Sequence, residues 1–101
     1  MIETLERLIL HIGTSLATVP ELGDQDWHDN AKWKARRDAF RAIINDLVID
    51  ERAKYREGVA DAYVLTLAGI RTSCTGGEHG LLTNWIAAAR RKIEELKAVA
   101  A

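Results

Sequence analysis

Apolar side chains recur at alternating steps of three and four residues at both ends of this 101-residue chain. This spacing places them along one face of an α-helix, in the pattern of helices that pack against other helices. The two seams are Ile2, Leu5, Ile9, Ile12, Leu16 and Val19 near the start, and Leu82, Ile86, Ala89, Ile93, Leu96 and Ala100 near the end. A helix is therefore predicted at each end. The first should end near Ala17, because Pro20 disfavours helical geometry in the residue before it.

Two further helices are predicted between these seams. Residues 31–57 carry an apolar face, and Gly58 is a suitable C-terminal cap for such a helix. Residues 59–70 are apolar nearly all round, which is typical of a helix surrounded by other helices. Residues 18–30 form a connector in which Asp26 and Asp29 are candidates to start the second helix. The apolar face of that helix consists of Trp33, Phe40, Ile43, Ile44, Leu47 and Val48.

No stretch alternates with a period of two for more than a few residues, so no strand is predicted. Leu, Ile, Val and Phe together number 26 of the 101 residues, which is enough to form a core. We therefore expect a single all-α domain over residues 1–101. It should be a compact antiparallel bundle of about four helices, with a long second helix and a Gly-rich loop before the last helix.

Charge and cysteine content exclude several classes of protein. The formal net charge is -1, so the chain lacks the overall field of a dedicated nucleic-acid or anionic-membrane binder. Its single cysteine, Cys74, cannot form an internal disulfide. No run approaches the roughly 20 apolar residues that span a bilayer. We expect a cytoplasmic protein with no membrane contact, no cofactor and no metal.

The first candidate surface is the basic stretch of residues 32–41, with five cations, one anion and two aromatic side chains. Such a stretch would suit phosphate contacts and base stacking, but Trp33 and Phe40 lie seven residues apart and belong to the apolar face. A tryptophan in a polar connector, such as Trp27, is either tucked onto the core or exposed as an anchor, and we favour the anchor. The predicted partner-binding residues are Trp27, Trp33, Arg36, Arg37 and Arg41.

The second candidate surface is the Gly-rich loop of residues 71–80. Glycines near a helix start free backbone N–H groups to point at an anion. The structural alternative, which the sequence favours, is a capping box formed by Thr75 and Glu78, with glycines that allow a close turn between helices. The predicted anion contacts are Arg71, Thr75, Gly76, Gly77 and His79.

Catalytic and metal-binding sets are not recognisable. Cys74 and His79 have no identifiable orienting partner, as a nucleophile and its base would need. The acidic segment 24–30 lacks the glycine and the glutamate of a calcium loop. Cys74 and the three histidines are scattered over the chain, without the paired close spacing of a zinc site.

One enzyme family supplies an alternative. Residues 57–70 resemble the third helix of the all-α nucleoside triphosphate pyrophosphatases of the MazG kind. In that family, Glu-x-x-Glu and Glu-x-x-Asp pairs on two facing helices hold magnesium against the triphosphate. In this chain Glu57 and Asp61 are four residues apart, and Asp61 could equally form a salt bridge or hydrogen bond from a mostly buried helix. The preceding helix offers Asp46, Asp50 and Glu51.

The sequence therefore predicts a non-enzymatic helical interaction protein that binds another protein. Arg and Trp dominate binding energy at protein interfaces; the basic stretch contains both, and the connector contains Trp27. A small regulator or inhibitor, such as a phage or mobile-element accessory protein, fits this description. The alternatives are the pyrophosphatase and a nucleic-acid-binding helical module. The seams at both ends also favour a homodimer.

Overall fold

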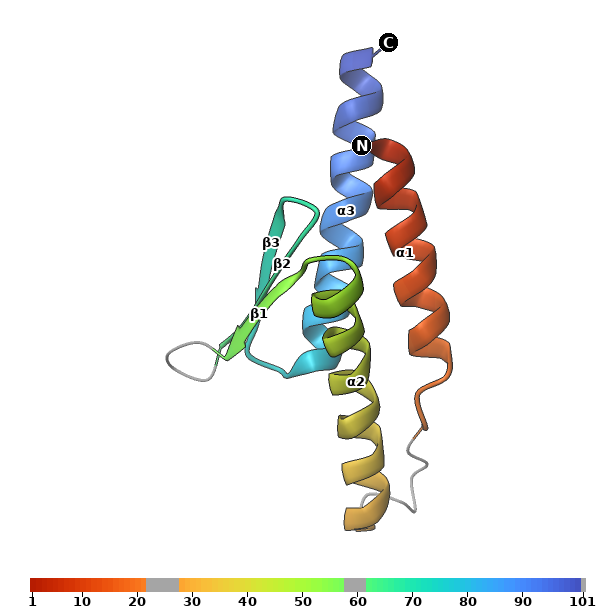
Figure 1. Cartoon of the computed structure of the whole chain (residues 1–101), viewed down its shortest axis with the longest axis vertical. Coiled ribbons are helices and arrows are strands. Elements are labelled where there is room, and N and C mark those ends of the chain that lie inside the picture. Colours follow the sequence, from red (N-terminus) through yellow and green to blue (C-terminus); the bar gives the residue numbers. More distant parts are fainter. Residues whose placement is uncertain (22–27, 58–61, 101) are drawn as a thin grey trace.

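The computed structural model of the chain describes residues 1–21, 28–57 and 62–100. Within these residues, three helices combine with a three-stranded antiparallel sheet, which makes the protein an α+β fold (Figure 1). The predicted all-α bundle of about four helices is therefore wrong. The elements follow in the order α1 (Ile2–Ala17), α2 (Asn30–Asp50), β1 (Lys54–Glu57), β2 (Tyr63–Leu67), β3 (Ile70–Cys74) and α3 (Glu78–Ala100).

The sheet packs against one side of the three helices. α1 and α2 run in opposite directions, and α3 lies beside α1 and also runs opposite to it (Figure 1). The sheet lies on the side of α2 and α3 that faces away from α1, and it contacts α3 mainly through β3. α2 and the start of α3 therefore lie between α1 and the sheet.

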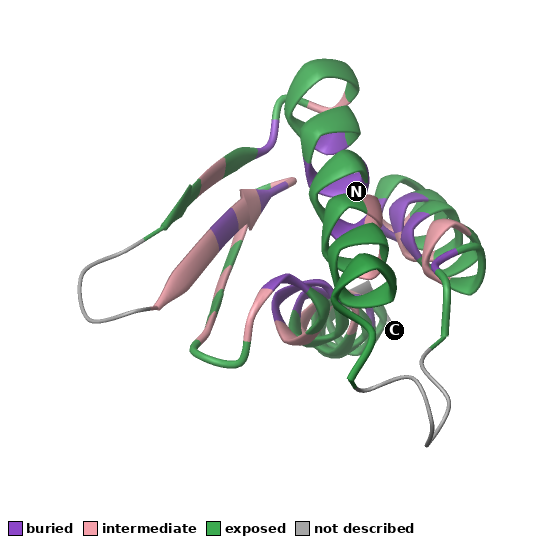
Figure 2. Ribbon diagram, turned by 90° about the horizontal axis from the view of Figure 1, so that it is seen from below, coloured by how far each residue is buried: buried purple, intermediate pink, exposed green. Residues whose placement is uncertain are grey.

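Both terminal helices are confirmed, and the described side chains of their apolar seams lie in the core or against it (Figure 2). α1 ends at Ala17, as predicted. The buried side chains of α1 are Leu5, Leu8 and Ile12, and those of α3 include Leu81, Leu82, Trp85, Ala89 and Ile93. Since these seams pack against other elements of the same chain, they stabilise the fold itself. The homodimer that the seams suggested stays a prediction.

The second helix begins as predicted and ends earlier. Asp29 caps α2, because its carboxylate accepts hydrogen bonds from the N–H groups of Ala31 and Lys32 at 3.0 and 3.2 Å. The helix ends at Asp50, whereas the sequence predicted that it would continue through residue 57. Two residues later Arg52 adopts a φ of 58°, in the left-handed region, and the chain turns into β1.

A further contact ties the end of α2 to α1. The two terminal nitrogens of the Arg7 guanidinium donate to the two Glu51 carboxylate oxygens, at 2.7 and 3.0 Å. This hydrogen-bonded pair lowers the pKa of Glu51. The contact fixes the first and second helices relative to each other at the point where the chain leaves α2.

The predicted central helix over residues 59–70 is wrong, because its described part forms β2 and the start of β3. Ala68 and Gly69 connect these strands as a two-residue hairpin turn, with φ values of 51° and 79°. A short apolar run fits either a buried helix or a buried strand, so periodicity alone does not separate them. Here Tyr63, Val64 and Thr66 are residue types that favour strands.

Side chains of β2 on the inner face of the sheet add buried contacts with α3 to those made by β3. Leu65 and Leu67 alternate with more exposed residues along β2 and are fully buried. The Trp85 indole of α3 is also fully buried, and its Nε1–H donates to the Leu67 carbonyl oxygen at 3.1 Å. No helix among the described residues is long and apolar enough to cross a membrane.

Candidate functional site

The two candidate surfaces meet in one groove between the N-terminal half of α2 and the turn that leads into α3. We call it the α2–α3 groove. It has a volume of about 400 Å³. It therefore combines part of the basic stretch with part of the Gly-rich segment. The groove is lined by Trp33, Arg36, Arg37, Phe40, Gly76, Gly77, Glu78 and His79.

A series of contacts forms the floor of the groove. The Arg36 guanidinium lies over the Phe40 ring, 4.9 Å from its centroid, and donates a hydrogen bond of 2.7 Å to the Pro20 carbonyl oxygen. The Phe40 ring also contacts the His79 ring of α3, at 5.2 Å between centroids and a tilt of 36°. These contacts join α2 to the first turn of α3 and position the arginine and the histidine in the same groove.

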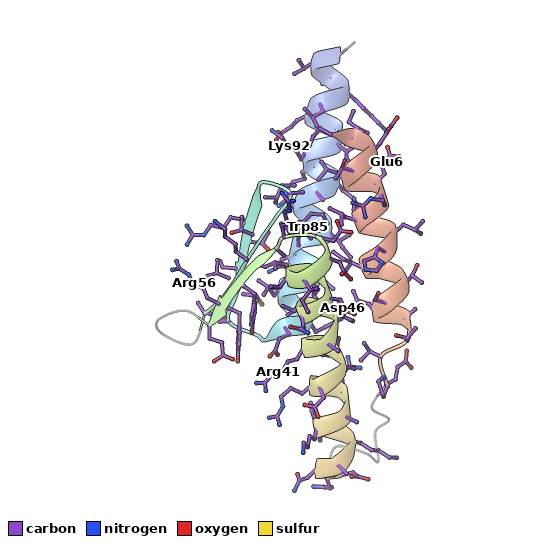
Figure 3. The ribbon with its side chains drawn as sticks, in the orientation of Figure 1. Glu6, Arg41, Asp46, Arg56, Trp85 and Lys92 are labelled. Carbon is purple, nitrogen blue, oxygen red and sulfur yellow. The ribbon has the colours of Figure 1, made fainter. Side chains whose placement is uncertain are left out.

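Arg41 connects the same two helices and is not at the groove. Its Nε donates to Glu78 Oε1 at 3.2 Å, and its Nη2 lies 4.0 Å from Glu57 Oε1. The hydrogen bond to Glu78 raises the pKa of Arg41. Arg41 points to the side of α2 on which the sheet lies (Figure 3). Arg41 was predicted to bind a partner, but in the structure it holds α2 against α3.

The predicted capping box at the start of α3 is wrong. The Leu81 N–H donates to the Gly77 carbonyl oxygen, so Gly77 occupies the N-cap position and Glu78 is the first helical residue. The Glu78 side chain is only 8% exposed and is paired with Arg41. A carboxylate in the first turn also interacts favourably with the helix dipole. Glu78 therefore stabilises this junction and adds no free negative charge to the groove.

The remaining predicted residues do not meet at the groove. Residues 71–74, predicted as loop, belong to β3, and Arg71 is exposed on the sheet. Thr75 is exposed and does not line the groove. Trp27 lies outside the described residues. The anion-binding loop predicted from the sequence is therefore divided between the sheet and the turn.

Cys74 lies beneath the turn and has a packing role. Its Sγ accepts a hydrogen bond from the Gly76 N–H at 3.2 Å. A Cβ atom placed on Gly80, in the first turn of α3, would lie 2.5 Å from the same sulfur. The thiol therefore fills the space that two glycines leave open, and it allows the backbone of α3 to approach β3 closely.

Two tyrosines on the inner face of the sheet were not singled out from the sequence. The rings of Tyr55 and Tyr63 stack at 6.4 Å between centroids and 11° between planes. The Tyr55 hydroxyl is buried and has no hydrogen-bond partner among the described residues. Burial, together with the negative charges of Glu78 and Glu57, raises the pKa of Tyr55 to about 12.

This pKa predicts a loss of stability at high pH. The pKa of Tyr55 is raised on folding, so the stability that the neutral Tyr55 side chain contributes is fully present below its unfolded pKa of 10.0. That stability is lost as the pH rises through about 12. We expect about 1–2 kcal/mol of unfolding free energy to be lost in this window through Tyr55. Denaturant titrations between pH 9 and 12 measure the loss, and Tyr55→Phe is the control. The variant should lose less stability over the same range, and equal losses would contradict the assignment.

No three His, Cys, Asp or Glu side chains converge on a metal position within the part of the chain that the structure describes. The segment that resembled a pyrophosphatase helix contains β2, so the helix on which that resemblance depended is not formed. Asp61 lies outside the described residues. Asp46 lies on α2, a different element from the sheet (Figure 3).

No protein-family model matches the chain, and no curated protein or solved structure is significantly similar to it. The site is therefore defined by its own geometry. It is an open groove with tryptophan, arginine and histidine side chains, at a junction that the Arg41–Glu78 ion pair holds together.

Proposed function

We propose that this protein is a non-enzymatic interaction protein, a small regulator or inhibitor that binds an acidic segment of another protein in the α2–α3 groove. The observation that carries the proposal is Trp33. Its side chain is 47% exposed at the groove, next to Arg36 and Arg37. Most large apolar side chains among the described residues are buried, so an indole that is half-exposed at the mouth of a groove is a candidate anchor.

The residue types in the groove are those that dominate binding energy at protein interfaces. Tryptophan and arginine are enriched among the few residues whose loss costs an interface most. Phe40 and His79 add aromatic surface beneath them, and their mutual contact already fixes their positions before a partner binds. A site whose side chains are already ordered loses less conformational entropy on binding than a mobile one.

The charge of the groove indicates the chemistry of its occupant. Among the described residues that line it, Arg36 and Arg37 are the cations, and the one acidic side chain, Glu78, is buried and neutralised by Arg41. The surface left to a partner is therefore positive. Charge complementarity favours a segment that carries Asp or Glu beside an apolar anchor residue.

Selection from a library of random peptides tests the proposal without knowledge of the natural partner. Peptides that bind the immobilised protein should be rich in Asp and Glu around an aromatic or aliphatic residue. Trp33→Ala should weaken their binding by about 10- to 30-fold, and Arg37→Glu should abolish the preference for acidic peptides. Calorimetry on the folded variants measures the affinity for acidic and for uncharged peptides, which tests both expectations.

Two matched variants act as controls. Leu10→Ala removes another exposed apolar side chain, from α1, and Arg91→Glu reverses another exposed cation, on α3. Both should leave peptide binding unchanged. Peptides without acidic residues, or peptides that bind Trp33→Ala as tightly as the unchanged protein, would contradict the proposal.

A further inference from the structure

We infer that the outer face of the sheet binds the phosphate backbone of duplex DNA. The face is set by strand register, because residues paired across neighbouring strands point to the same side. The inner side is identified by the buried Leu65 and Leu67. The outer side then carries one cross-strand row of Lys54, Thr66 and Arg71, and a second row of Arg56, Val64 and Ser73.

The three cations of this outer face have no acidic ion-pair partner among the described residues. Lys54, Arg56 and Arg71 are exposed and form no ion pair with any described residue. Neither of the two outer rows contains Asp or Glu. Arg56 points away from the helices (Figure 3). In contrast, Arg41 on α2 is already ion-paired with Glu78 of this chain.

The dimensions of the face suit a duplex. Neighbouring strands lie about 4.8 Å apart, so β1 and β3 are separated by roughly 10 Å. The major groove of B-form DNA is about 12 Å wide, which is close to this separation, whereas that of an RNA duplex is too narrow for side chains to read. Cations on both outer strands, Lys54 and Arg56 on β1 and Arg71 on β3, could then reach phosphates on both sides of the groove. A depression of about 250 Å³ lies at this surface.

The other residues of the face favour a duplex over a single strand or a protein. Single-stranded nucleic acid binds through aromatic rings on which bases stack, but Tyr55 and Tyr63 turn inward and stack on each other. Protein interfaces need apolar anchors, and Val64 is the one apolar side chain in the two outer rows. Thr66 and Ser73 carry hydroxyl groups, which donate to phosphate oxygens.

Three phosphate contacts predict a definite salt dependence. Each contact contributes about -0.9 to the slope of log affinity against log salt, so three give about -2.7. Between about 50 and 200 mM salt the affinity should then fall about 40-fold. The net charge of -1 leaves little long-range attraction to add to these contacts.

Fluorescence anisotropy with a labelled DNA duplex of mixed sequence tests the inference. The triple variant Lys54→Gln, Arg56→Gln, Arg71→Gln should bind at least about 10-fold more weakly at low salt, with a slope near zero. The matched control is Arg91→Gln, Lys92→Gln, Lys97→Gln, which removes the same charge from exposed positions on α3. It should retain the affinity and the slope of the unchanged protein. Circular dichroism confirms that both variants are folded.

Further arms of the experiment separate this inference from other partners and from the groove. Trp33 lies at the α2–α3 groove and not on the sheet, so Trp33→Ala should not change duplex binding. Peptide binding in the groove and duplex binding on the sheet are therefore tested independently. Equal binding by the two triple variants would overturn the inference. The inference would also be overturned if the protein bound a single strand, an RNA duplex or vesicles that contain phosphatidylserine more tightly than it binds the DNA duplex.

Discussion

Replacing Trp85 by alanine is expected to lower the free energy of unfolding by about 3–5 kcal/mol. The indole is fully buried, and it packs where α3 meets the sheet. Its removal leaves a cavity and takes away the hydrogen-bond donor of the Leu67 carbonyl oxygen. Domains of this size are stable by only about 5–15 kcal/mol, so the variant should be close to unfolding at room temperature.

Trp85→Phe separates the two contributions. Phenylalanine keeps most of the apolar contact area but has no N–H donor, so the Leu67 carbonyl oxygen loses its partner at a cost of about 1–3 kcal/mol. Urea titrations followed by far-ultraviolet circular dichroism measure both variants without relying on tryptophan fluorescence. Trp33→Phe, at a half-exposed position, is the control and should change stability by less than about 1 kcal/mol. Near-normal stability of Trp85→Ala would contradict the packing of α3 on the sheet.

Gly80→Ala is expected to destabilise the protein by about 1–3 kcal/mol, although alanine is the better helix former. Gly80 lies in the first turn of α3, where the added Cβ would meet Cys74 Sγ at 2.5 Å. The sulfur is itself held by the Gly76 N–H, so the side chain cannot rotate away without losing that hydrogen bond. The steric cost should therefore exceed the gain in helix propensity.

A second substitution and a matched control make this prediction specific. In a Cys74→Ala background the sulfur is absent, and Gly80→Ala should become neutral or stabilise by up to about 1 kcal/mol. Gly13→Ala in α1 is the control, since its added Cβ would meet no described atom within 4 Å beyond its chain neighbours and the backbone of its own helix, and it should stabilise. Thermal unfolding of the four variants measures the coupling. A Gly80→Ala variant as stable as Gly13→Ala would show that α3 and β3 are not packed this closely.

The parts of the fold that the sequence predicted correctly are its long helices. α1 and α3 have apolar seams over several turns, and no strand could bury such a pattern on one face. The start of α2 was also predicted, because the Asp29 carboxylate caps the helix by accepting a hydrogen bond from a nearby backbone N–H group. These signals are local, so a single sequence is sufficient to read them.

The sheet was missed because its strands are short and their local signals point elsewhere. β1 consists of Lys54–Glu57, whose lysine, arginine and glutamate are good helix formers. The hairpin turn has Ala68 where asparagine or glycine would be diagnostic, although its φ of 51° requires the left-handed conformation. Pairing between strands and packing on α3 decide the structure of this region, and neither is visible in a window of a few residues.

The sequence identified most residues of the candidate site, but it did not predict that they lie together. Trp33, Arg36 and Arg37 were singled out on one segment, and Gly76, Gly77 and His79 on another, without any sign that they adjoin. Their meeting depends on the contact between Phe40 and His79 and on the ion pair between Arg41 and Glu78. The basic outer face of the sheet could not be predicted at all, because the cations gather only once the strands pair.

Whether the groove at the junction of α2 and α3 binds an acidic peptide can be measured by a nuclear magnetic resonance titration. The isotope-labelled protein would be titrated with an acidic peptide selected from the library. The resonances of the Trp33 indole N–H and of the Gly76, Gly77 and His79 amides should shift together and saturate with one affinity. Shifts confined to α1 or to the C-terminal half of α3, with these four signals unchanged, would contradict binding in the groove.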